Sequence, residues 1–388
     1  MDLKCLEKRG FIILLSVLFL NLVVLNIAMA QESGDKKTIN PNVPGLLTYK
    51  DKNGVTKPVT SLREWEKKRR QILDSMQSVM GKLPERSGLP PLDVKVSETF
   101  RGDNYTRLTI NFTIAENENA SAYLYLPLQQ NIREKLPAMV VLHGTGDLGK
   151  QLVDGGSPLA NRAIAKELAQ RGYIVIAPDY PSFGDQKDYD FDHDRYESGT
   201  MKAIFNHMRC VDLLQSRAEV DPDRIGVIGH SLGGHNSMFV GAFDKRIKVI
   251  VSSCGWTLFD YYNAGEAVTL KFGGRLGPWA QKRYMPLFLE RYKQDGDKTP
   301  FDFDEVIATF APRPFFSNSP LHDANFDVNG VKKGIENASE VYHLFKTENN
   351  LQVCYPESGH DFPTEVRLEA YRFVDKVLKH KPLMELIN

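Results

Sequence analysis

The sequence has little cysteine, no excess of either charge and none of the common zinc-binding patterns. Only 4 of its 388 residues are cysteines. Because it contains no C-x-x-C or H-E-x-x-H pattern, we expect no metal and no other cofactor. Cys210, Cys254 and Cys354 sit among apolar residues, which predicts buried free thiols rather than a disulfide framework. Basic and acidic residues balance at 49 each, so no net field favours nucleic acid or an anionic membrane as a partner.

The N-terminus carries the pattern of an export signal. Basic residues precede a long apolar run over residues 11–27, and Ala28-Met29-Ala30 supplies a small-x-small cleavage site. We therefore predict a signal peptide over 1–30, a mature protein that begins at Gln31 without stable membrane insertion, and a periplasmic or secreted location. An uncleaved anchor is the alternative, because the apolar run approaches the length of a membrane span.

The rest of the chain has the composition of a globular protein, with 42% hydrophobic and 25% charged residues. Residues 31–60 are polar and predict an extended arm, followed by a catalytic domain over 61–388. Ser61 and Glu64 form a capping box at the start of the first predicted helix.

Alternating apolar residues over 92–126 predict antiparallel strands, and continuous apolar strands then alternate with helices. Such continuous strands predict an α/β fold whose central sheet is mostly parallel and covered by helices on both faces. The predicted strands are 138–142, 173–177, 225–228, 247–252, 315–316 and 351–354, and the predicted helices are 160–171, 196–217 and 364–378.

One short motif indicates nucleophilic catalysis. Gly229-His230-Ser231-Leu232-Gly233 fits the G-x-S-x-G nucleophile elbow, and it lies between a β-branched strand and the small-residue start of a helix. So sharp a turn predicts a positive φ at Ser231, flanked by glycines that keep side chains away from its hydroxyl. The motif and its context together predict that Ser231 is the nucleophile.

A serine nucleophile needs a histidine base and a carboxylate that orients the base. On an α/β sheet the three can occur along the chain as serine, acid and histidine, in loops that follow strands. His360 lies in the loop after the strand 351–354, and Asp323 follows the strand 315–316. Asp327 is the alternative acid, and His322 is expected to neighbour the site without acting as the base.

The oxyanion of such a reaction requires two backbone donors. One is expected to be the N–H of Leu232, and the other the N–H of Thr145, with that of Gly144 as the alternative. His143 is expected to brace this loop, while His230 and His235 are expected to pack around the elbow.

With these residues in place, the chain resembles the α/β-hydrolase superfamily over about residues 61–380. The elbow and the Gly359-His360-Asp361-Phe362 loop are similar to those of the superfamily as a whole. The His143-Gly144 turn and the segments 172–173, 178–180 and 311–314 are similar to those of the branch that contains dienelactone hydrolases and acetyl-xylan esterases. Dienelactone hydrolases use a cysteine nucleophile, so Ser231 favours ester hydrolysis. The resemblance implies an α/β-hydrolase fold and a serine carboxylic-ester hydrolase.

The resemblance also implies a cap, which we place in the insertion 256–300. Its aromatic residues include Trp279 and Tyr284, which we predict, with Tyr180, to bind substrate. Aromatic rings can stack on sugars or simply hold a cap together. The predicted substrate is a small-molecule or oligosaccharide ester, such as an acetylated xylan.

Two other functions remain open from the sequence. The first is a serine peptidase similar to prolyl oligopeptidases, although only about 60 mature residues precede the first strand, too few for their propeller. The second is a hydrolase-fold binding protein without activity, although no member of the triad is missing.

The export motif makes a direct prediction. Mass spectrometry of protein from the exported fraction should find Gln31 at the N-terminus, because cleavage follows the small residue Ala30. Recovery of residues 1–30 in a membrane pellet would instead identify an anchor.

Overall fold

The computed structural model describes residues 45–128 and 134–384. The predicted signal peptide and residues 31–44 of the predicted arm lie outside the described residues. The rest of the arm is a hairpin of β1 (Thr48–Lys50) and β2 (Thr56–Pro58) rather than an extended segment. Within the described ranges we find no helix of the length and hydrophobicity that crossing a membrane requires.

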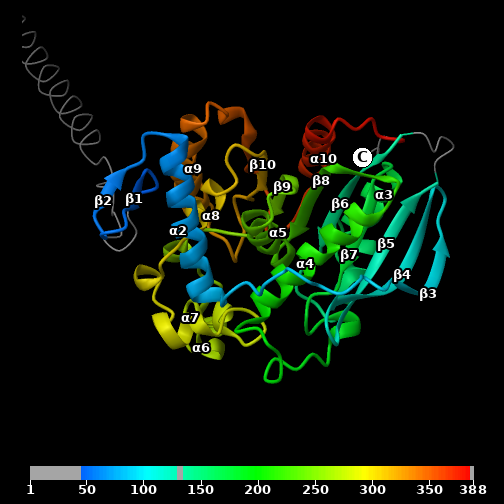
Figure 1. The fold of residues 1–388 in the computed structure, drawn as a ribbon, viewed down its shortest axis with the longest axis horizontal. Coiled ribbons are helices and arrows are strands. Elements are labelled where there is room, and N and C mark those ends of the chain that lie inside the picture. Colours follow the sequence, from blue (N-terminus) through cyan, green and yellow to red (C-terminus); the bar gives the residue numbers. More distant parts are fainter. Residues whose placement is uncertain (1–44, 129–133, 385–388) are drawn as a thin grey trace, which may run out of the picture. The chain divides into compact units, whose positions relative to one another are not determined.

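Nine strands form one sheet in the order β11-β10-β9-β8-β6-β7-β5-β4-β3 (Figure 1). The strands from β6 to β11 pair in parallel, whereas β3, β4 and β5 pair antiparallel and β5 joins the rest antiparallel to β7. This confirms the predicted fold class. The strands are β3 (Lys95–Arg101), β4 (Tyr105–Ala115), β5 (Glu118–Pro127), β6 (Leu136–Leu142), β7 (Ile174–Pro178), β8 (Val220–His230), β9 (Ile247–Ser253), β10 (Phe315–Asn318) and β11 (Leu351–Cys354).

Helices bury both faces of this sheet. Alternate residues of β6 show it, because Val140 and Leu142 pack into the cluster that contains residues of α4 and α5, while Met139 and Val141 pack into the cluster that contains residues of α3 and α10. A strand that is buried on both faces must be apolar throughout, as the sequence of β6 is. The longer helices are α2 (Leu62–Met80), α4 (Gly199–Ser216), α5 (Leu232–Phe243), α9 (Val328–Leu344) and α10 (Thr364–Leu378), and the shorter ones are α3 (Ile164–Gln170), α6 (Glu266–Phe272), α7 (Leu287–Tyr292) and α8 (Phe303–Ala308).

Two predicted helices begin later than expected, for local reasons. The helix predicted from Ala160 begins at Ile164, because Asn161 has a φ of 62° that no helix accommodates. The helix predicted from Tyr196 begins at Gly199, because the Ser198 side chain accepts the Met201 N–H at 3.0 Å and caps it. The helix α10 has the predicted bounds, and α8 and α9 were not predicted.

Buried charges on α2 fasten it to the rest of the domain. Arg69 donates to the carbonyl of Ala242 in the last turn of α5, at 2.6 Å, and to the carbonyl of Thr309 just after α8, at 3.0 Å. Beside it, Lys68 pairs with Glu305 at 2.8 Å, and burial raises the pKa of Glu305 to about 7. The two bonds from Arg69 satisfy carbonyls that the ends of helices leave without a partner.

The order of the strands determines where a ligand can bind. The chain passes from β6 to β7 on one side and reaches β8 on the other, so the connections diverge at the carboxyl ends of β6 and β8. Open α/β sheets bind ligands at such a switch point. Ser231 follows β8 directly at this place.

A buried histidine makes stability depend on pH. Burial lowers the pKa of His207 in α4 from 6.5 to about 3, so the unfolded chain takes up a proton that the folded chain refuses. The contribution of His207 to stability is therefore fully present above pH 6.5, and it is lost as the pH falls toward 3. Between pH 7 and pH 5, this histidine should cost about 2 kcal/mol of the free energy of unfolding.

Urea unfolding at the two pH values measures this effect. In His207→Phe the decrease in the free energy of unfolding from pH 7 to pH 5 should be smaller than in the wild type by about 2 kcal/mol. The control is His343→Phe, at a side chain that is 82% exposed, which should keep the wild-type decrease. Equal decreases in all three proteins would contradict the assignment.

Candidate active site

Ser231 occupies a strained turn between β8 and α5. Its φ is 56° and its ψ is −118°, as the elbow motif predicts. The glycines on either side allow a close approach of backbones: a Cβ on Gly229 would lie 2.3 Å from the Gly233 carbonyl oxygen, and a Cβ on Gly233 would lie 2.0 Å from that of Leu142. The motif therefore requires glycine at both positions.

The structure brings Asp323 to His360. The Nδ1 atom of His360 lies 2.9 and 3.0 Å from the two carboxylate oxygens of Asp323. The N–H groups of Asn325 and Phe326 also donate to this carboxylate, whose side chain is only 1% exposed. A carboxylate held in this way fixes the proton on Nδ1 and leaves Nε2 as the free acceptor of the ring.

The other candidate acid lies elsewhere. Asp327 caps α9, where its carboxylate accepts the Asn329 N–H at 2.7 Å. His322 lies on the surface and contacts Glu357 at 2.8 Å. The contact with His360 thus belongs to Asp323 rather than to Asp327, which the sequence had left open.

Two further histidines surround the elbow. His230 ends β8, is buried, and contacts the Ser253 hydroxyl at 3.0 Å. Its ring also lies 4.9 Å from that of His360, so it forms part of the site as well as packing there. Burial holds the pKa of His230 well below its usual range, so this ring stays neutral. His235 packs against Trp279 and Phe239, as expected.

His143 orients the loop that follows β6. Its Nε2 accepts the Tyr180 N–H at 3.0 Å, which leaves the proton on Nδ1 to be donated to the Gly144 carbonyl at 2.7 Å. Burial lowers the pKa of His143, which keeps this neutral form. Because the C=O and N–H of a trans peptide point in opposite directions, the Thr145 N–H is turned away from His143.

Leu232 is the first residue of α5, so its N–H is among those that begin a helix without an intrahelical acceptor. The geometry is therefore compatible with Thr145 and Leu232 as the two oxyanion donors.

A buried ion pair anchors the segment that follows β6. Lys150 donates to Asp179 at 2.6 Å from its side chain and at 2.8 Å from its backbone, and both side chains are almost fully buried. Gly149 and Gly184 approach Asp179 so closely that a Cβ on either would lie within 2.2 Å of a carboxylate oxygen. No sequence motif signals this pair, since its members lie 29 residues apart.

Ser231, His360 and Thr145 face one pocket of about 360 Å³. Most of its wall comes from the segment between β6 and α3, residues 144–164. The apolar lining residues are Leu148, Leu152, Val153, Pro158, Leu159 and Ile164. Small-molecule sites have volumes of about 300–1,000 Å³.

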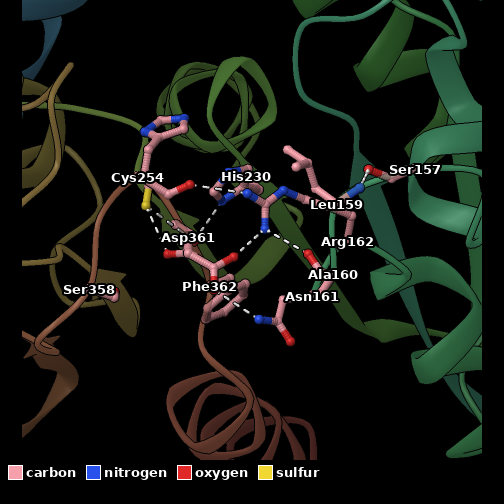
Figure 2. A network of polar contacts seen from close by, with 12 residues as sticks. Ser157, Leu159, Ala160, Asn161, Arg162, His230, Cys254, Ser358, Asp361 and Phe362 are labelled. Atoms are coloured by element: carbon pink, nitrogen blue, oxygen red, sulfur yellow. Dashed lines mark hydrogen bonds and ion pairs between the residues drawn. The ribbon is translucent and has the colours of Figure 1, made fainter.

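A polar network ties the pocket wall to the loop of His360 (Figure 2). Arg162 donates to the Asp361 carboxylate at 2.5 Å and to the His360 carbonyl at 3.1 Å. Asn161 donates to the other Asp361 oxygen at 2.8 Å. No sequence motif indicated a role for Arg162, and the only signal for this network was the position of Asp361 directly after His360.

The expected roles of two aromatic residues are corrected by their burial. Trp279 is only 6% exposed and is packed among other rings, so it has no free face for a sugar. Those rings belong to His235, Phe259, Tyr262, Phe303 and Phe326. Tyr180 is 3% exposed, and its hydroxyl donates to the Arg283 carbonyl at 2.7 Å, so it supports the insertion 256–300.

Tyr284 does reach the site. It is half-buried, and its hydroxyl lies 3.4 Å from that of Thr145. Of the three aromatic residues predicted to bind substrate, Tyr284 is the one that the structure places beside the candidate oxyanion loop.

One group of side chains has the spacing of a metal site. Ligand atoms of Cys254, Asp323 and His360 lie within 4.8 Å of one another. The Cys254 thiol donates to the Asp361 carbonyl at 3.1 Å, and burial, together with the charge of Asp323, raises its pKa well above its usual range. A neutral thiol is a poor metal ligand. Cys210, Cys254 and Cys354 are free, as expected, but only Cys210 and Cys254 are buried, and Cys354 is half-buried.

Comparison with known proteins agrees with this fold. Residues 139–367 match the model of the alpha/beta hydrolase family. The YtaP protein of Bacillus subtilis (strain 168) is 28% identical over 77% of this chain and 96% of its own length. A carbohydrate esterase from an unknown prokaryotic organism is 26% identical over 77% of this chain and 78% of its own.

Among solved structures, a glucuronoyl esterase from Solibacter usitatus superposes with a TM-score of 0.66. It is 21% identical, and the match covers 87% of this chain and 97% of that one. At this level of identity the likeness shows the fold alone.

The burial of Trp279 predicts a structural role. Trp279→Ala should lower the free energy of unfolding by about 3–5 kcal/mol, because it empties the centre of an aromatic cluster. Tyr284→Phe is the matched control, since it keeps the ring and removes only a partly exposed hydroxyl, and it should cost no more than about 1 kcal/mol. Denaturant unfolding measures both. Full stability of Trp279→Ala with a selective loss of activity on carbohydrate esters would restore the stacking role.

Proposed function

This chain belongs to the alpha/beta hydrolase family, and on that basis we propose that it is a serine esterase with a triad of Ser231, His360 and Asp323. The observation that carries the proposal is the pairing of His360 with a buried Asp323 in the same pocket as the strained Ser231. A serine, an oriented histidine and two N–H donors are what acyl transfer requires.

In the proposed reaction the Ser231 hydroxyl oxygen attacks the ester carbonyl carbon while Nε2 of His360 takes its proton. The carbonyl oxygen becomes an oxyanion and accepts the N–H groups of Thr145 and Leu232. The intermediate collapses by breaking the bond to the alcohol, which leaves with the proton from His360. Water then attacks the acyl-serine in the same way, which releases the acid and restores Ser231.

We propose a carbohydrate ester as the substrate and the periplasm or the exterior as the location. The similarity to a carbohydrate esterase over most of both chains supports the substrate class. The N-terminal export pattern supports the location. Tyr284, beside Thr145, remains the candidate aromatic contact for the sugar.

Changing the nucleophile tests the mechanism. Ser231→Ala should lower kcat on p-nitrophenyl acetate by about four to six orders of magnitude, because no other group can form the acyl intermediate. Circular dichroism should show an unchanged fold. A fluorophosphonate probe should label Ser231 in the wild type only, and activity that survives in the variant would refute the assignment. A proline amide, tested beside the ester, distinguishes an esterase from a peptidase.

Changing the acid tests the triad separately. Asp323→Asn should lower kcat by about three to four orders of magnitude, because His360 loses its orienting carboxylate. The control is Asp327→Asn, which leaves a residue that still caps α9 and should stay close to wild type. Equal or reversed losses in steady-state kinetics would move the acid to Asp327.

A further inference from the structure

The pocket beside Ser231 is apolar for most of its wall. Val153 and Ile164 are buried at its base, and Leu152 is half-buried. Leu152 lies against the candidate oxyanion loop, since a Cβ on Gly146 would come within 3.0 Å of its Cδ1 atom. Glycine at this position thus leaves the leucine side chain free to face the substrate.

Apolar side chains also form the rim of the pocket, where they are open to solvent. Leu159 is 62% exposed and Leu148 is 40% exposed, and both line the same pocket. Contiguous exposed apolar side chains at a concave site are typical of surfaces that bind an apolar group.

The charges at this pocket favour an uncharged occupant. Arg162, the cation among the lining residues, already pairs with Asp361 at 2.5 Å. Asp147, also in the lining, is exposed. The neighbouring His230 stays neutral, since burial lowers its pKa. The pocket therefore offers an anionic group no free partner.

The wall that carries these residues is held in place relative to His360, the proposed general base. Leu159 donates its N–H to the Ser157 hydroxyl at 3.1 Å, and the following Asn161 and Arg162 bind Asp361, next to His360 (Figure 2). A chain seated against Leu159 would consequently be positioned with respect to the scissile bond.

We propose that this pocket binds an apolar acyl or alkyl chain of several carbons, longer than acetyl, on one side of the ester bond. The proposal rests on the proposed esterase function and specifies its substrate. A pocket of about 360 Å³ is far larger than the methyl of an acetyl group needs. Each methylene buried against the leucines would strengthen binding in the transition state by up to about fourfold.

Two ester series test the proposal and distinguish the two sources of the chain. The first lengthens the acyl group in p-nitrophenyl esters from acetate to octanoate. The second lengthens the alcohol in alkyl acetates from methyl to octyl. In one series kcat/KM should rise with each methylene by up to about fourfold until the pocket is full, and the series that rises identifies the occupant.

Variants of the wall decide whether the chain lies in this pocket. Leu152→Trp fills the space and should flatten the rise of kcat/KM with chain length. Leu159→Ser, at an exposed position that does not endanger folding, should also reduce the rise. The matched control is Leu62→Ser, at a leucine in α2 that is 51% exposed and not in the lining, which should keep the wild-type profile.

The outcomes separate this inference from the proposed function. Turnover that depends on Ser231 but is flat or falls with length in both series would overturn the apolar pocket and leave the esterase standing. A rise that Leu152→Trp and Leu159→Ser leave unchanged would also overturn it, because the chain would then bind elsewhere. If no ester is hydrolysed at all, both proposals fail.

Discussion

The contact between the start of α5 and the end of β6 is the constraint on which the site depends. The backbone of Gly233 lies so close to the Leu142 carbonyl that no other residue fits there. This contact places the N–H of Leu232 near the loop that begins at His143, which extends directly from β6. The strain at Ser231 is stored in the same turn, and the burial of the surrounding sheet sustains it.

Two ion pairs then fix the loops that the sheet alone would leave free. Lys150 and Asp179 hold the segment after β6, and Arg162 and Asp361 join the end of that segment to the loop of His360. The buried pair of Lys150 and Asp179 has further bonds to Asp185 and to neighbouring backbone N–H groups, which offsets much of the cost of burying its charges. Preorganisation of this kind keeps donors in position before the substrate arrives.

The aromatic residues of the insertion 256–300 support the site rather than line its pocket. Trp279 sits at the centre of an aromatic cluster that also includes Phe303 and Phe326 from outside the insertion. Phe326 in turn lies against the His360 ring at 6.0 Å, so the cluster supports the base. The apolar wall of the pocket comes instead from residues 144–164.

The sequence by itself determined the parallel sheet, the elbow at Ser231 and the loop positions of Asp323 and His360, because periodicity and motif spacing are local properties of the chain. It could not choose between Asp323 and Asp327, place Trp279 in the core, or find the partner of Arg162. Those outcomes depend on contacts between segments as much as 199 residues apart, as Arg162 and Asp361 are. The burial of each side chain and its partners is decided only when the elements pack together.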